Sequence, residues 1–153
     1  RAAIISRHDM DDHQELTDQQ YAQLLAFRDG LRSFLAWSAG QARQVGITAP
    51  QHQLLLAIRG HGGAPTVGEV AEHLLLRHHS AVGLVDRAER AGLVERDASD
   101  GDRRVVRLRL TTDGEDKLAA LAAAHIEELS RLAGSSVSLW SGAAAPPSPE
   151  MQP

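Results

Sequence analysis

Hydrogen-bond donors and cations gather at two places in the middle of the chain. The first is a predicted helix whose outward face carries mostly short or hydrogen-bonding side chains. Its candidate contact residues are Arg77, His78, His79, Ser80, Val82, Gly83 and Arg87. The second is a turn-rich stretch that holds Asp102, Arg103 and Arg104. Such side chains can donate to base edges and phosphate oxygens, and a carboxylate beside an arginine can aim its guanidinium. The chemistry that these residue types suit is recognition of duplex DNA.

A helix-turn-helix pattern would position the first group. Thr66 and Glu69 predict a capping box at the start of one helix, because their side chains can satisfy each other's backbone amides. Apolar residues then recur at helical spacing: Val67, Val70, Ala71, Leu74 and Leu75. After a break near Leu76-Arg77, a second helix repeats the pattern with Ala81, Leu84, Val85 and Ala88, until Gly92 ends it. Gly83 lowers helix stability by roughly 1 kcal/mol relative to Ala, which is easier to explain if something approaches the backbone closely.

The period then changes from that of a helix to that of a strand. Residues 93–96 predict a short strand. In residues 105–111 the apolar side chains alternate with the others, so that Val106, Leu108 and Leu110 share one face. Helix, turn, helix, strand, charged turn and strand predict a winged helix-turn-helix, in which one helix enters the major groove and a hairpin reaches sideways.

Longer helices flank this unit. Thr17 with Gln20 predicts a capped helix to about Ala39, with apolar residues Leu24, Phe27, Leu31, Phe34 and Leu35. Thr48 with Gln51 opens a short helix whose Leu54, Leu55, Leu56 and Ile58 are expected to be deeply buried. Thr112 with Glu115 predicts a last capped helix of about twenty residues, with the stripe Leu118, Leu121, Ala122, His125, Leu129 and Leu132. An amphipathic helix at each end needs a partner for its stripe, and a second copy of the chain is the economical one.

The run GLVERDASDGDRRVVRLRLTTDG, preceded by HSAVGLVDRAERA, resembles the MarR family of bacterial transcription regulators. The resemblance extends over about residues 17–132. It implies a sequence-specific DNA-binding regulator, typically a repressor released by a small molecule, whose terminal helices interleave in a homodimer on a pseudo-palindromic operator. It further implies that the helix from His78 to Ala91 reads the major groove, and that Arg104, held by Asp102, enters the minor groove. Family members usually finish with another helix, which the polar and proline-rich end of this chain predicts to be missing or very short.

The expected fold class is therefore mainly α with a small β-hairpin, a winged helix-turn-helix with N- and C-terminal helices forming a dimerisation layer. Residues 1–16 are expected to be a flexible arm and residues 143–153 a disordered tail. Between them, residues 17–142 form the domain, with dimerisation helices at about 17–40 and 112–133 and a DNA-binding part at about 48–111.

Composition limits the other function classes. The 153 residues include no cysteine, which excludes disulfides and thiolate metal sites, and no apolar run predicts a membrane span. We expect a cytoplasmic protein that needs no cofactor. The net charge of −4 argues against DNA binding, but residues 77–109 hold eight Arg and six acidic residues, a local charge of +2.

Alternatives remain at this stage. No nucleophile elbow, phosphate-binding Gly loop or dinucleotide fingerprint is present, so no enzyme is expected. A winged helix can instead be a protein-interaction module, and the eight histidines leave a His-based metal-responsive regulator open, although none are paired at i,i+4 and no metal site is predicted. The resemblance also implies a crevice for a small aromatic or phenolic ligand, for which the candidate residues are Arg28, Trp37, His52 and Arg59.

Overall fold

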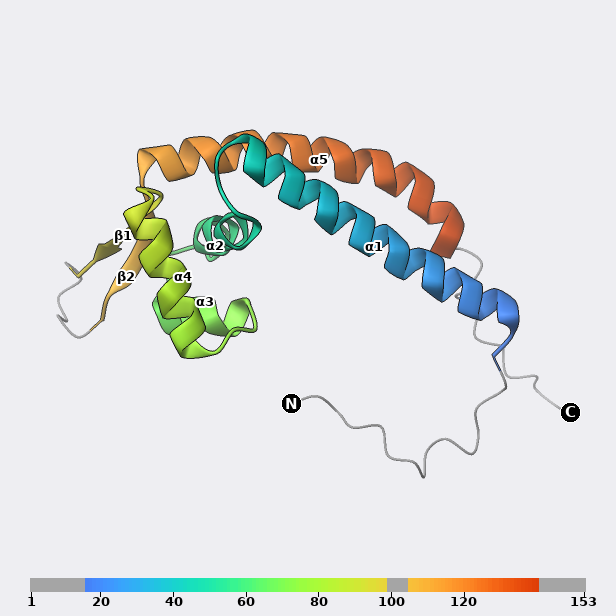
Figure 1. Cartoon of the computed structure of the whole chain (residues 1–153), viewed down its shortest axis with the longest axis horizontal. Coiled ribbons are helices and arrows are strands. Elements are labelled where there is room, and N and C mark those ends of the chain that lie inside the picture. The colour runs from blue at the N-terminus through green and yellow to red at the C-terminus, as the bar shows by residue number, and fades with distance from the viewer. Residues whose placement is uncertain (1–15, 99–104, 141–153) are drawn as a thin grey trace, which may run out of the picture.

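The computed structural model describes residues 16–98 and 105–140, with side chains described as far as residue 133. In chain order the elements are α1 (Asp18–Gln44), α2 (Ala49–Gly60), α3 (Val67–His73), α4 (His78–Arg90), β1 (Val94–Asp97), β2 (Arg107–Leu110) and α5 (Thr112–Trp140). In Figure 1 the long helices α1 and α5 run beside each other, and the shorter elements gather at one end of that pair. The predicted mainly helical winged helix-turn-helix with a small hairpin is confirmed. The wing tip, the N-terminal arm and the proline-rich tail lie outside the described residues.

The two long helices extend further than their sequence patterns predicted. Helix α1 continues to Gln44 instead of ending near Ala39, so it is more than one turn longer than its sequence pattern predicted. Helix α5 continues to Trp140 instead of ending near residue 133, although Gly and Ser residues of low helix propensity enter its last turns. The C-terminal helix is therefore longer than about twenty residues.

Three of the four predicted helix starts are confirmed. Thr17, Thr48 and Thr66 each accept from the third helical amide, and the Gln or Glu at that position bonds back to the cap. The fourth prediction, Thr112 with Glu115, is wrong. Thr111 caps α5 instead, since its Oγ1 accepts from the Gly114 amide at 3.1 Å.

One hydrophobic core joins the winged helix to the long helices. Its members come from all five helices, the hairpin and the turns beside them, and the fully buried ones include Leu54, Leu55, Val85, Leu93, Leu108 and Leu121. Two predicted core residues are not buried. Leu56 is half exposed because it lies on the outer side of α2, and Leu75 is exposed because α3 ends before it.

Strand β2 of the hairpin is attached to the loop between α2 and α3. Strands β1 and β2 pair antiparallel, with Val94 opposite Leu110 and Asp97 opposite Arg107. The Leu108 amide donates to the Pro65 carbonyl at 2.7 Å, and the Arg107 guanidinium donates to the Ala64 carbonyl at 2.9 Å. These bonds fix the strand to the loop between α2 and α3.

The turn after α4 connects the hairpin to α5. Gly92 adopts φ 73°, and the amides of Gly92 and Leu93 return to the carbonyls of Glu89 and Ala88, which is the Schellman arrangement. Thr111 Oγ1 donates to the Gly92 carbonyl at 2.6 Å. Gly114 lies so close to this turn that a Cβ there would be 2.2 Å from the Leu93 carbonyl oxygen. The position of α4 is therefore coupled to the start of α5 through backbone contacts.

Candidate nucleic-acid interface

Helix α4 has one buried face and one accessible face. Ala81, Leu84, Val85 and Ala88 are all buried, as their spacing predicted. The predicted contact residues lie on the rest of the helix and at its start. Of these, the exposed ones are Arg77, His78, His79, Ser80 and Arg87, while Val82 and Gly83 are half-buried. The core thus holds one side of α4 and leaves a row of hydrogen-bond donors on the other.

Gly83 is not required by packing inside the chain. A Cβ at this position would meet a single neighbour, the mobile end of the Arg87 side chain, at 3.3 Å. Its backbone is helical, so no unusual φ calls for glycine. Without a side chain, this turn of α4 allows an external group to approach the backbone closely.

The start of α4 differs from the starts of α1, α2 and α3. Its N-cap is Arg77, which provides no side-chain acceptor for the first amides, whereas the other three helices are capped by threonine. The unpaired amides and the helix dipole make this end attractive to an anion, and Arg77 adds a full positive charge. A phosphate group is compatible with this arrangement.

The wing tip with Asp102, Arg103 and Arg104 lies outside the described residues, so its geometry stays a prediction. The strands that lead to it are described. At the base of the wing, Arg109 Nε bonds to Asp97 Oδ2 at 2.8 Å across the ladder. This base is held firmly on the winged helix.

Arg96 is a contact that the sequence did not reveal. It lies on β1 and bonds to two carboxylates of α4, to Asp86 at 2.6 Å and to Glu89. The hydrogen bond to Asp86 is the main cause that raises the pKa of Arg96 above its ordinary value. Arg96 therefore fixes α4 against the hairpin and neutralises acidic charge beside the predicted DNA-contacting face.

The four candidate ligand residues do not form one site. Trp37 and His52 both lie against His125 of α5, each with ring centroids 4.8 Å from it. Arg28 is exposed on α1, and Arg59 lies beside Glu115 of α5, so neither belongs to that group. Two of the four are therefore brought together, around a histidine that the sequence suggested only as part of a helical stripe.

The group around His125 connects three helices. His125 Nε2 lies 2.7 Å from Ser38 Oγ of α1, and its Nδ1 lies 2.7 Å from the Leu121 carbonyl. His52 of α2 is buried, and this burial, followed by the charge of His125, lowers its pKa below 6.5. His52 is thus favoured in its neutral form at the junction of the long helices and the winged helix.

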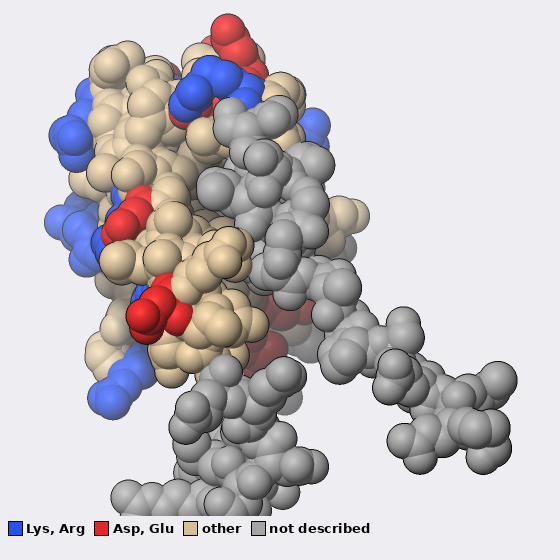
Figure 2. All heavy atoms as spheres, turned by 90° about the vertical axis from the view of Figure 1, so that its right-hand side faces the viewer, with Lys and Arg blue, Asp and Glu red and all other residues tan. Residues whose placement is uncertain are grey.

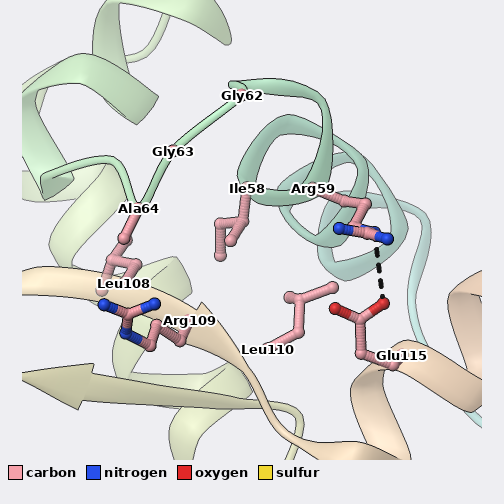
Figure 3. A pocket seen from close by; sticks show the side chains of 9 residues that line it. All are labelled: Ile58, Arg59, Gly62, Gly63, Ala64, Leu108, Arg109, Leu110 and Glu115. Atoms are coloured by element: carbon pink, nitrogen blue, oxygen red, sulfur yellow. Dashed lines mark ion pairs between the residues drawn. The ribbon is translucent and has the colours of Figure 1, made fainter.

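Arg59 lines an open cavity of about 420 Å³ between α2, β2 and the start of α5. Figure 3 shows Arg59 facing Glu115, with 3.4 Å between their charged groups, and the apolar side chains of Ile58 and Leu110 beside the pair. The cavity is lined by Ile58, Arg59, Gly62, Gly63, Ala64, Leu108, Arg109, Leu110 and Glu115.

The described residues contain no cluster of three or more His, Asp or Glu that could hold a metal ion. Within the same ranges, no helix combines the length and apolarity that crossing a membrane requires.

Comparison with known proteins points in one direction. Residues 45–105 match the MarR family. The chain is 32% identical over 78 residues to the HTH-type transcriptional repressor MdtR of Bacillus subtilis (strain 168), a match that covers 51% of this chain and 50% of MdtR. The chain therefore spans about half the length of that curated relative.

Solved structures of similar shape cover more of the molecule. A MarR family transcription regulator superposes with a TM-score of 0.70 at 25% identity, over 81% of this chain and 83% of its own. A variant of MepR from S. aureus, bound to an oligodeoxyribonucleotide, superposes with a TM-score of 0.61 at 24% identity, over 78% of this chain and 84% of its own. Over residues 45–105 the chain is thus similar to the MarR family, and its fold is that of solved MarR family regulators.

Proposed function

We propose that this protein is a sequence-specific DNA-binding transcription regulator, a repressor that acts as a homodimer in the cytoplasm. The observation that carries the proposal is the two-sided construction of α4. Its inner face is fixed in the core, and its outer face presents exposed donors around a glycine that packing does not require. A rigid helix with such a face suits the major groove of DNA.

The predicted contacts divide into two kinds. His79, Ser80 and Val82 are expected to face base edges, while Arg77, His78 and Arg87 are expected to reach phosphates or guanine edges. On the wing, Arg104 is expected to enter the minor groove with Asp102 orienting it and Arg103 beside it. Arg96 supports the predicted contacts of α4 and those of the wing. It does so because it joins β1, the strand that leads to the wing, to α4.

Exposed apolar residues support the homodimer. Five large apolar side chains of α1, namely Leu24, Leu25, Phe27, Leu31 and Leu35, are about half exposed, as are Ile126 and Leu129 of α5. Figure 2 faces the end of the molecule where α1 begins and α5 ends. There, uncharged residues occupy most of the described surface, while Lys and Arg lie mainly along the left edge and at the top, with a few Asp and Glu among them. A second copy that covers these side chains would place two α4 helices on one duplex.

A small ligand that releases the DNA is the last part of the proposal. The junction around His125, with Trp37 and His52, lies where the long helices meet the winged helix. A phenolic or aromatic molecule bound there would change the spacing of the two α4 helices in the dimer. Arg28 and Arg59 are not part of this group and are no longer needed for it.

The experiment begins with selection of bound duplexes from a random pool, followed by titration of the selected duplex by fluorescence anisotropy. Arg87→Ala should weaken binding at least tenfold, because it removes a cation from the α4 face. Arg43→Ala is the matched control, since Arg43 is an exposed arginine in the last turn of α1, and it should change affinity less than twofold. Wild-type protein that selects no sequence would contradict the proposal and favour a winged-helix interaction module that binds protein.

The relatives support the regulator class over an enzyme. MdtR is named as a transcriptional repressor, and the MepR variant was solved with bound DNA. No catalytic group is assigned in the described residues of this chain.

A further inference from the structure

Leu75 combines two features that a folded chain normally avoids. Its φ is 55°, and it is the one non-glycine residue with positive φ in the described part of the chain. Its side chain is 93% exposed, more than any other large apolar residue described. A leucine in this conformation is strained, and a leucine in water gains no burial.

The same turn occurs after two other helices, which allows a direct comparison. After α1 and α4, the residue with positive φ is Gly46 or Gly92, and the amide of the next residue returns to a carbonyl five residues back. After α3, the Leu75 amide donates to Glu72 and the Leu76 amide to Ala71, in the same pattern. Glycine is the residue that this position favours, and only here does leucine occupy it.

The fold itself gives no reason for the leucine side chain. Leu75 is not in the hydrophobic core, and the turn is held by backbone bonds that glycine would form equally well. A strained leucine that is exposed and outside the core points to a contact outside the chain.

The position of Leu75 restricts what that external contact is. It lies two residues before Arg77, the N-cap of α4, beside the exposed His78 and His79. The other end of α4 is bonded to α5 through Gly92 and Thr111. Since α4 has 13 residues and a helix rises about 1.5 Å per residue, its start lies roughly 20 Å from that contact. In Figure 1 the turn between α3 and α4 is on the side of the winged helix away from α5, so a second copy held by the long helices would not cover it.

We infer that Leu75 is an apolar contact to DNA at the edge of the groove that α4 enters. This rests on the proposed function and adds a contact that donor chemistry does not predict. The C–H surfaces that a duplex offers there are the deoxyribose face and the C5 methyl of thymine. Leu75 is exposed and precedes Arg77 by two residues, so its side chain would meet such a surface beside the cations predicted to reach phosphate.

Four variants distinguish the effect of losing the leucine side chain from the effect of backbone strain at position 75. Leu75→Gly and Leu75→Asn both accept positive φ and lack the apolar side chain, whereas Leu75→Met keeps an apolar side chain and Leu75→Ala keeps only the strain. DNA affinity should therefore fall about tenfold for Gly, Asn and Ala and less than twofold for Met. The melting temperature should be unchanged or raised by a few degrees for Gly and Asn.

The anisotropy titration and thermal melting of the full chain give distinguishable outcomes. Lower DNA affinity with an equal or higher melting temperature for Leu75→Gly supports the contact, because loss of structure would lower both. Leu75→Gly that binds the selected duplex as tightly as wild type overturns it, while the proposed function stands. Wild type that binds no duplex overturns both.

Duplexes with deoxyuridine in place of thymidine identify the surface. If wild type weakens on that duplex while Leu75→Gly does not, the contact is a thymine methyl. If neither protein is affected by the replacement while Leu75→Gly still binds less tightly, the contact is the deoxyribose face.

Discussion

The winged helix and the long helices differ in how far their large apolar residues are buried. In the winged helix, Leu54, Leu55, Val85 and Leu108 are fully buried within a single chain. On α1, by contrast, Leu24, Leu31 and Leu35 remain about half exposed. The winged helix buries a core of large apolar side chains within one chain, whereas the long helices leave an apolar stripe exposed. The same chain therefore holds one region that can present side chains rigidly and another whose surface is suited to assembly.

The largest effect is expected from a charge within the exposed stripe of α1. Leu31→Asp should raise the dissociation constant of the dimer by at least a hundredfold, because each dimer would bury two unpaired carboxylates. Sedimentation at micromolar concentration measures this. Ser33→Asp is the control, since Ser33 is exposed and lies about 200° around the helix from Leu31. A dimer that survives Leu31→Asp would show that the long helices do not form the interface.

The next largest effect is expected from a substitution at a close backbone contact between the two regions. Gly114→Ala places a Cβ 2.2 Å from the Leu93 carbonyl oxygen, so α5 or the turn after α4 must shift. We expect a loss of about 2–3 kcal/mol in the free energy of unfolding. Gly30→Ala within α1 meets no atom within 4 Å and should instead stabilise the chain by about 0.5–1 kcal/mol. Equal effects of the two substitutions in urea unfolding would contradict this reading of the contact.

A smaller effect is expected within the winged helix at Arg96. Arg96→Met keeps the length of the side chain but removes its bonds to Asp86 and Glu89. Stability should fall by about 1 kcal/mol, since the carboxylates are partly in water and gain hydration. DNA affinity should fall about fivefold, because two negative charges on α4 would no longer be neutralised. If adding Asp86→Asn to the Arg96→Met protein fails to restore part of the DNA affinity, the uncompensated negative charge is not the cause of the loss.

The smallest effect is expected on stability when the pH is lowered, through His52 at the junction of the two regions. The pKa of His52 is lowered by burial and then by His125, so the folded state binds its proton less readily than the unfolded state. Stability from the neutral ring is complete above the unfolded value of about 6.5 and is lost as the pH falls through the lower folded value. Melting temperatures from pH 8 to pH 5 should fall less steeply in His52→Gln. If melting temperature falls with pH as steeply in His52→Gln as in wild type, other groups cause the pH dependence.

Local signals predicted the fold well. The capping boxes at Thr17, Thr48 and Thr66 were predictable because each depends on residues three positions apart. Adjacent threonines made the fourth ambiguous, and the structure uses Thr111. Leu75 continued the apolar spacing of α3, but the helix ends at His73, and spacing alone does not report where a helix stops.

The candidate site was less predictable where it depends on tertiary contacts. The two faces of α4 follow from helical periodicity, so the residues on its accessible side could be predicted from the sequence. Arg96 and Asp86 are ten residues apart on different elements, and no pattern pairs them. His125 meets Trp37 and His52 only because α1, α2 and α5 pack together, whereas Arg28 and Arg59, which were predicted with them for a ligand crevice, lie outside this group.

The division of roles between the two regions can be measured directly on the DNA. If the long helices fix two α4 helices about one turn of DNA apart, the selected duplex should contain two half-sites with centres roughly 10 bp apart. Inserting 5 bp between them rotates one half-site to the opposite side of the duplex. Affinity should then fall to that of a single half-site, whereas inserting 10 bp tests the reach of the dimer on the same face. A selected duplex with one half-site, or affinity unchanged by the 5 bp insertion, would contradict the account.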